Sequence, residues 1–283
     1  MINDKSIEIL YQKIDILDDL IAEGNNLSEI TKSSIFNSKS IINEIKQVSK
    51  NGIIYSFNKN YQILEIGPGM GVLTKFLMTE NTIFKVIEID KESINYLKDK
   101  YPKIEKNIIE GDFLKLDIRK HFESDVSIIG NFPYYISSQI LFRVWEHNEI
   151  IHELVGMFQK EVADRIIALK GRERGILSVL IQVFYNVKKC IDVSPDNFTP
   201  PPKIQSSVIK LNRNKRKKLD CSKKLFKQVV KTAFNQRRKT LRNALKTYNI
   251  EKDSKIESLL SLRAEQLNVE DFIKITKHIE SIL

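Results

Sequence analysis

The chain opens with apolar positions at helical spacing. Between residues 5 and 23 they fall three or four apart, at Ile7, Leu10, Ile14, Leu17 and Ile21, which predicts an amphipathic helix. A second helix is expected after Ser38. Residues 1–30 contain seven acidic residues and two lysines. We therefore expect an acidic helical extension that docks on the rest of the protein or on a partner, without contacting nucleic acid.

From residue 61 onward, short apolar strands alternate with helices. Strands are expected at 61–66, 82–89, 107–110 and 126–129, and helices after Gly71, over 91–100 and from about Ser137. This alternation is typical of an α/β fold built on a parallel sheet. Such sheets bind ligands beyond the carboxyl ends of their strands. The residues that follow each strand are therefore candidate site residues.

A glycine-rich loop, GPGMG at residues 67–71, follows the first strand. Glycines let the backbone approach a ligand closely, but dinucleotide-binding and methyl-donor enzymes share this pattern. Pro68 removes an N–H of the kind that binds pyrophosphate. Glu65, just before the loop, is easier to reconcile with a cationic ligand than with pyrophosphate. The loop therefore favours a methyl-donor cofactor.

Acidic residues stand at the ends of the second and third strands. Glu88 is placed to bind ribose hydroxyls, whereas Asp90 suits the N-cap of helix 91–100. Asp112 can accept a hydrogen bond from an adenine amine, and Phe113 can cover the ring. Each residue alone is as easily a capping acid or a core aromatic. Together, the consecutive strand ends favour a nucleoside site.

The fourth strand leads into Asn131-Phe132-Pro133-Tyr134. The Asn131 amide oxygen can accept a hydrogen bond from an exocyclic amine. Pro133 stiffens the turn and offers a carbonyl that we expect to be a free acceptor. Tyr134 offers a ring face for stacking. The turn suggests a site for the amino group of a nucleobase; the alternative is a stiffened turn with a buried tyrosine.

The positive charge is concentrated at the carboxyl-terminal end. Residues 213–283 contain 19 Lys and Arg against 8 Asp and Glu, whereas residues 1–212 contain 27 against 28. Such asymmetry indicates a polyanion-binding domain on a near-neutral body, although a solvated basic helical face is the alternative. Arg238 and Arg242 are expected on one helical face.

Composition narrows the remaining classes. The sequence has no run of about 18 apolar residues, so we expect no membrane span. Its start lacks a basic region followed by an apolar stretch, so we expect no secretory signal. Cys190 and Cys221 stand alone, which argues against a zinc site and a disulfide framework. All four histidines lie outside the motifs. We expect a cytoplasmic monomer with no metal and no catalytic histidine.

Several motifs together resemble one family, the bacterial small-subunit (16S) rRNA adenine dimethyltransferases. They are EIGPGMGVLT, VIEID, EGDF, NFPY, FQKEVADRI, GILSVLIQVFY, FTPPPKIQSSVI and AFNQRRKTLRNAL. The resemblance implies a Rossmann-like S-adenosylmethionine domain over residues 31–212 and a small all-α RNA-binding domain over 213–283. It also implies dimethylation of two adjacent adenosines in the 3′-terminal hairpin of 16S rRNA, in the small subunit or its precursor.

The resemblance also implies a role for each matching residue. The cofactor would be bound by Gly67, Gly69, Gly71, Glu88, Asp112 and Asn131. The catalytic residues would be Asn131 and Pro133, which hold the target amine, and Tyr134, which stacks on the target ring with Phe198. RNA would be bound by Lys203, Arg237, Arg238, Lys239 and Arg242.

Two positions depart from the family pattern. A motif that helps to enclose the cofactor should fall at residues 33–36, where this chain has Ser-Ser-Ile-Phe. Tyr135 replaces a small polar residue that is common after the NFPY motif, which could narrow the pocket. These departures support an alternative reading, a ribosome-assembly RNA-binding factor with weakened catalysis. A large-subunit rRNA methylase is disfavoured by FTPPPKIQSSVI and by the basic helix.

Overall fold

The computed structural model describes residues 62–71, 73–78, 83–195, 204–252 and 255–283. The expected amino-terminal helices and the segment 33–36 lie outside the described residues. So do Phe198 and Lys203.

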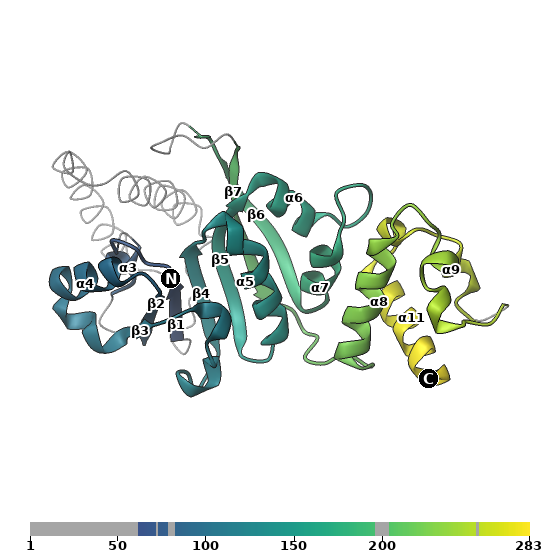
Figure 1. Ribbon diagram of the computed structural model, residues 1–283, viewed down its shortest axis with the longest axis horizontal. Coiled ribbons are helices and arrows are strands. Elements are labelled where there is room, and N and C mark those ends of the chain that lie inside the picture. Colours follow the sequence, from purple (N-terminus) through teal and green to yellow (C-terminus); the bar gives the residue numbers. More distant parts are fainter. Residues whose placement is uncertain (1–61, 72, 79–82, 196–203, 253–254) are drawn as a thin grey trace, which may run out of the picture. The chain divides into compact units, whose positions relative to one another are not determined.

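The structure contains a seven-stranded sheet (Figure 1). Its order is β3-β2-β1-β4-β5-β7-β6. The strands are β1 (Gln62–Ile66), β2 (Phe84–Glu88), β3 (Ile108–Glu110), β4 (Val126–Asn131), β5 (Ile151–Gln159), β6 (Tyr185–Val193) and β7 (Ser206–Arg213). The four strands expected from the sequence are confirmed to within two residues at each end.

The sheet reverses its direction of growth at β1. Strand β1 pairs in parallel with both β2 and β4, β2 pairs with β3, and β4 pairs with β5. Successive crossovers therefore leave β1 toward opposite edges of the sheet, which makes the carboxyl ends of β1 and β4 a topological switch point. In open α/β sheets this switch point is the usual ligand site.

The helices follow the strands as expected, with one shift. They are α3 (Thr74–Leu77), α4 (Lys91–Lys100), α5 (Tyr134–Glu146), α6 (Lys160–Ile167), α7 (Ile176–Phe184), α8 (Lys223–Asn235), α9 (Leu241–Ala244), α10 (Glu257–Leu260) and α11 (Val269–Ile282). Asp90 caps α4 by accepting a hydrogen bond from the Ser93 N–H at 2.8 Å, which confirms its predicted role. The expected start of α5 near Ser137 is wrong. That helix begins at Tyr134, directly after Pro133, whose fixed φ leads into a first turn.

The chain forms two compact units. Of the described residues, the first contains those up to 140 together with those in 150–160 and 189–210, and the second contains those in 141–149, 161–188 and 211–283. The sequence analysis assigned only 213–283 to the smaller domain. The second unit also contains residues 141–149 and 161–188, which include most of α6 and all of α7.

In the first unit, apolar side chains from most strands meet in one cluster beside the sheet. The cluster includes Ile63, Val86, Ile129, Val155 and Val208. Strand β1 is buried at four of its five positions, as is typical of a parallel strand that is covered on both faces. This packing fixes the register of the strands, and with it the positions of their carboxyl ends.

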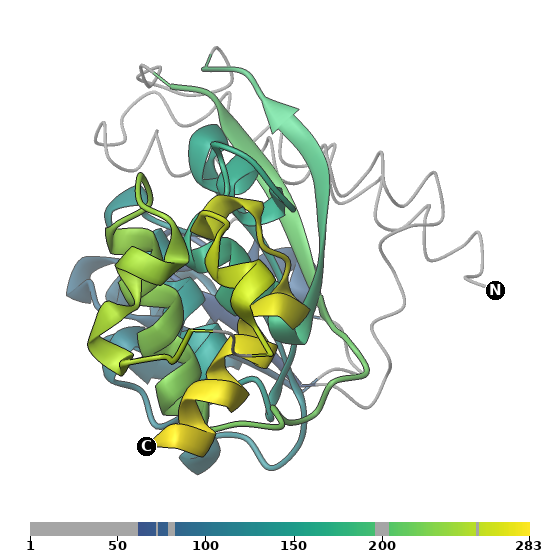
Figure 2. The same cartoon turned by 90° about the vertical axis from the view of Figure 1, so that its right-hand side faces the viewer.

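In the second unit, α8 and α11 lie side by side (Figures 1 and 2). The rings of Phe234 and Phe272 stack with centroids 5.9 Å apart. Helix α8 ends at Asn235, and a turn separates it from α9. The prediction that Arg238 and Arg242 share one helical face is therefore wrong, because Arg238 lies in the turn. No helix in the described part of the chain is long and apolar enough to cross a membrane.

Candidate active site

The loop after β1 has a backbone that only glycine adopts easily. Gly67, Gly69 and Gly71 have φ values of 66°, 53° and 76°, in the left-handed region that is strained for other residues. At Gly71, an added Cβ would lie 2.7 Å from the Tyr101 ring and 2.9 Å from Leu97. The glycines therefore set both the shape of the loop and its contact with α4 and the residue that follows it.

Gly71→Ala is expected to destabilise the protein more than Gly67→Ala. Both changes impose a strained φ that costs about 1–2 kcal/mol. An added Cβ at Gly67 has no atom within 4 Å, whereas at Gly71 it would overlap Tyr101 and Leu97. Thermal unfolding of the two variants separates the conformational cost from the steric one. Equal melting temperatures would contradict the close packing at Gly71.

Glu65 is a buried acid beneath this loop. It is 1% exposed, and its Oε2 accepts a hydrogen bond from the Thr74 hydroxyl at 2.8 Å. Burial, aided by the neighbouring Glu88 carboxylate, raises the pKa of Glu65 to about 8, against the opposing effect of Thr74. Removal from water disfavours the charged form. Burial therefore favours the protonated form of Glu65 at neutral pH.

Glu88 is held by backbone N–H groups at the end of β2. Its Oε1 accepts from the N–H groups of Ile89 at 2.8 Å and Asp90 at 3.0 Å, and its Oε2 accepts from Gly69 at 3.1 Å. An ionised carboxylate offers about four acceptor positions. One position on Oε2 is left for a hydroxyl of a ligand. The Gly69 bond also ties the glycine loop to this acid.

The end of β3 agrees only in part with the prediction. Asp112 Oδ1 accepts from the Leu114 N–H at 2.9 Å, which leaves Oδ2 to accept from a ligand amine. Phe113 is 3% exposed and belongs to the core, so the expectation that it covers a bound ring is wrong. Ile89 is 67% exposed and presents apolar surface directly after Glu88. The sequence analysis missed Ile89, although an apolar residue between two acids at a strand end was a visible signal.

Asn131 ends β4 and precedes the proline turn. Among the described residues, its side-chain amide has no hydrogen-bond partner, so both its donors and its acceptor can serve a ligand. The Pro133 carbonyl is not the free acceptor that we expected, because it accepts from the Ile136 N–H at 3.1 Å. Its second lone pair has no partner in the part of the chain that the structure describes. Tyr135 is 82% exposed, so its side chain lies in solvent and does not fill the site.

Tyr134 is the first residue of α5, and its ring is half-buried. Its hydroxyl forms a hydrogen bond with the Ser206 hydroxyl, with 2.5 Å between the oxygens. Burial raises the pKa of the Tyr134 phenol, which the Ser206 bond opposes. Both effects concern the hydroxyl, and the ring face takes no part in the hydrogen bond with Ser206.

The ends of the four parallel strands meet at one edge of the sheet. Glu65 and Ile129 are register partners on β1 and β4, and a Cβ on Gly130 would lie 2.7 Å from the Ile66 carbonyl oxygen. The turn that carries Asn131 therefore starts beside the glycine loop. The structure thus brings together the loop, Glu88, Asp112 and the Asn131 turn. No histidine occurs at these four strand ends.

The predicted RNA-binding residues of the second unit differ in their surroundings. Arg237 pairs with Glu265 at 3.1 Å and donates to the Arg172 carbonyl. Arg242 pairs with Glu257 and donates to the Ile250 carbonyl at 2.8 Å. The side chains of these two arginines therefore already have partners within the unit. Arg238 and Lys239 are exposed and have no side-chain partner in the described part of the chain.

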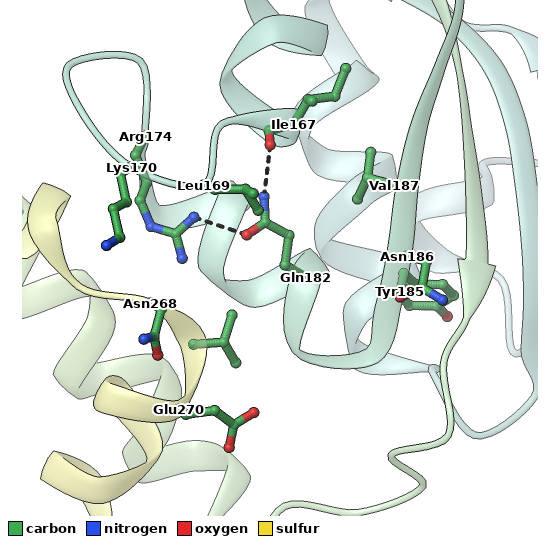
Figure 3. A pocket seen from close by; sticks show the side chains of 11 residues that line it. Ile167, Leu169, Lys170, Arg174, Gln182, Tyr185, Asn186, Val187, Asn268 and Glu270 are labelled. Atoms are coloured by element: carbon green, nitrogen blue, oxygen red, sulfur yellow. Dashed lines mark hydrogen bonds between the residues drawn. The ribbon is translucent and has the colours of Figure 1, made fainter.

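A cavity of about 510 Å³ lies within the second unit (Figure 3). Its most buried polar side chain is Arg174, which is 1% exposed and donates to Gln182 Oε1 at 2.8 Å and to the Ala168 carbonyl. The Gln182 amide in turn donates to the carbonyls of Ile166 and Ile167. These side chains satisfy the carbonyls at the end of α6. None of the predicted site residues lines this cavity.

The fold and the site together define a class of protein. A Rossmann-like sheet with a glycine loop, an acid at the end of β2 and an Asn-x-Pro-aromatic turn after β4 is the arrangement of an amine-directed methyltransferase. Residues 24–281 match the family model "Ribosomal RNA adenine dimethylase". The chain belongs to this family.

Relatives and solved structures agree with that assignment. The ribosomal RNA small subunit methyltransferase A of Bacteroides thetaiotaomicron is 51% identical over 225 residues, which are 78% of this chain and 84% of that protein. The protein of the same name from Flavobacterium johnsoniae is 52% identical over 222 residues, which are 78% and 85%. A dimethyladenosine transferase from Plasmodium falciparum superposes with a TM-score of 0.67 at 23% identity, covering 86% of this chain and 96% of that one. The 23S rRNA methyltransferase ErmE superposes with 0.64 at 20% identity, covering 83% and 97%. The two structures support the fold alone.

Proposed function

We propose that this protein uses S-adenosylmethionine to dimethylate the exocyclic amines of two adjacent adenosines in the 3′-terminal hairpin of 16S rRNA. The proposal is supported by the Asn131 amide, which has no hydrogen-bond partner among the described residues and ends β4 where the turn starts beside the glycine loop, in a chain of this family. The activity belongs to maturation of the small ribosomal subunit in the cytoplasm. We propose that the protein acts as a monomer.

The residues at the strand ends fit the proposed cofactor. The glycine loop leaves room for the methionine part, and Glu65 beneath it can neutralise a cation once ionised. Glu88 has one acceptor position for a ribose hydroxyl, and Asp112 has one for the adenine amine. Ile89 offers apolar surface to the adenine ring. The cofactor supplies a methyl group that its sulfonium centre activates for transfer.

Asn131, Pro133 and Tyr134 act on the target adenosine. The Asn131 amide oxygen and the second lone pair of the Pro133 carbonyl accept hydrogen bonds from the two amine protons. These two hydrogen bonds would favour a pyramidal amine whose nitrogen lone pair is exposed to accept the methyl group that the bound cofactor would supply, with the cofactor's sulfur as the leaving group. The positive charge that develops on nitrogen is stabilised by the same two acceptors, and a proton then leaves to solvent. Stacking on Tyr134, worth about 1–3 kcal/mol, offsets the cost of extracting the base.

Arg238 and Lys239 are proposed to contact RNA phosphates. The double variant Arg238→Glu/Lys239→Glu is expected to raise the KM for small subunits by about tenfold and to weaken the salt dependence of binding, because phosphate contacts release counterions. Lys252→Glu/Lys255→Glu makes the same charge change at exposed lysines of the second unit and is the control. Equal effects of both pairs would indicate net charge rather than a local contact.

The test is methyl transfer from labelled S-adenosylmethionine to small subunits that lack these methyl groups. Dimethyladenosine should appear at two adjacent positions in the 3′-terminal hairpin. Subunits with both target adenosines replaced by guanosine are the control and should take up no label. The alternative, an assembly factor with weakened catalysis, has no support from the relatives. It predicts tight subunit binding without label.

A further inference from the structure

Two residues outside the Asn131–Tyr134 turn hold it in place. They are Gly156, on the neighbouring strand β5, and Ser206, on β7, the next strand of the sheet. Neither belongs to the residues assigned to the cofactor or the target base. Gly156 contacts Phe132 and Ser206 contacts Tyr134, the residues that precede and follow Pro133 in the sequence.

Gly156 provides part of the seat for Phe132. Gly130 and Gly156 are register partners on β4 and β5, and the Phe132 ring, 1% exposed, lies against both. A Cβ at Gly156 would lie 2.1 Å from Phe132 Cε2, and one at Gly130 would lie 2.5 Å from Cε1. Phe158 packs edge-on against the same ring at a centroid distance of 5.3 Å. The ring can therefore occupy this position only because two adjacent strands lack a side chain there.

Ser206 fixes the other side of the turn. Its side chain is fully buried, and its hydroxyl is 2.5 Å from the Tyr134 hydroxyl. Tyr134 is its hydrogen-bond partner in the described part of the chain. A buried hydroxyl without a partner is costly, so serine suits this position because of Tyr134. The Tyr134 backbone belongs to α5, and the Tyr134 hydroxyl is hydrogen-bonded to Ser206 on β7. These two attachments define the plane of the ring.

We propose that Ser206 and Gly156 are positioning residues for the target adenosine. Phe132, seated on Gly156, sets the direction of the Asn131 amide and the Pro133 carbonyl, while Ser206 sets the plane of the stacking ring. Small displacements of acceptors that stabilise a transition state lower the rate strongly. The inference rests on the proposed function, and it assigns to β5 and β7 a role in turnover that is separate from cofactor binding.

A double-mutant cycle tests the Ser206 contact. Ser206→Ala and Tyr134→Phe each remove one hydroxyl and keep the Tyr134 ring. Each is expected to lower the single-turnover rate by about five- to tenfold, and the double variant should lose no more than either single variant. Binding of S-adenosylhomocysteine should stay within about twofold of wild type.

The neighbouring serine is the matched control. The Ser207 hydroxyl bonds to the Asp192 carboxylate, away from the turn. Ser207→Ala removes a buried hydroxyl of the same strand, and it should leave the single-turnover rate unchanged even if it lowers the melting temperature. A rate loss in Ser207→Ala equal to that in Ser206→Ala would overturn the inference, because the effect would then be one of general stability.

A second variant tests the Gly156 seat by rescue. Gly156→Ala should lower the single-turnover rate more than it lowers cofactor affinity, and Phe132→Leu in the same chain should restore part of the rate by removing the overlapping ring atoms. Failure of Gly156→Ala to slow turnover, or full additivity in the Ser206 cycle, would overturn the proposal. If wild-type protein transfers no methyl group, the proposed function itself fails. If wild type is active and Ser206→Ala equals it, only the positioning role fails.

Discussion

Asn131→Ala is expected to lower the single-turnover rate of methyl transfer by about 10²- to 10³-fold, the usual effect of removing one group that stabilises charge in a transition state. The Asn131 amide has no partner among the described residues, so its loss leaves no buried group unsatisfied and should not disturb the fold. Rapid-quench measurements with saturating cofactor and undermethylated subunits provide the rate. Thermal unfolding checks the fold.

Asn131→Asp separates the acceptor from the rest of the side chain. Aspartate keeps an oxygen acceptor at the same position, so this variant should retain more activity than Asn131→Ala. Affinity for S-adenosylhomocysteine should fall less than turnover in both variants. An alanine variant that turns over at the wild-type rate would remove Asn131 from the chemistry and leave the turn with a structural role only.

The strand ends could be predicted from sequence because each signal is local. Glu88, Asp90 and Asp112 follow apolar strands at once, and each accepts a hydrogen bond from a backbone N–H within three residues. Glu88 also accepts from the more distant Gly69 N–H. Parallel pairing then brings these positions to one edge of the sheet without further information. The same local logic failed for Phe113, because an aromatic residue after a strand can face the core as easily as the ligand.

The contacts that could not be predicted join residues far apart in the chain. Ser206 meets Tyr134 across 72 positions, and the Gly156 seat depends on the register between β4 and β5. Arg237 finds Glu265 28 positions away. A run such as Arg237-Arg238-Lys239 shows positive charge, but only the fold shows which cations already have a carboxylate partner. The sequence therefore predicts the residues of the site better than it predicts the long-range contacts that position them.

Glu65 should make the stability of the protein depend on pH between about 5 and 8. Its pKa is about 8 in the folded protein against an ordinary value of 4.5. The folded state therefore binds one more proton than the unfolded state in this window, and the free energy of unfolding falls as pH rises. The contribution is fully present below pH 4.5. It is lost by about pH 9, and the loss amounts to roughly 4–5 kcal/mol at most.

Glu65→Gln isolates this effect. Burial lowers the pKa of Lys75 to about 8 and also lowers the pKa of His147. Both groups therefore make the free energy of unfolding rise with pH, opposite to Glu65. They are common to both proteins and cancel in the difference. The variant should gain stability relative to wild type as pH rises from 5.5 to 8, measured by denaturant unfolding of the whole protein.

Thr74→Val provides the sign control for Glu65. The Thr74 hydrogen bond lowers the pKa of Glu65, so its removal should raise that pKa further and move the loss of stability to higher pH. A difference between wild type and Glu65→Gln that does not vary with pH would mean that Glu65 is ionised in the folded protein. Glu65 would then be negatively charged before any ligand binds, and binding of a cationic ligand would not release a proton from it.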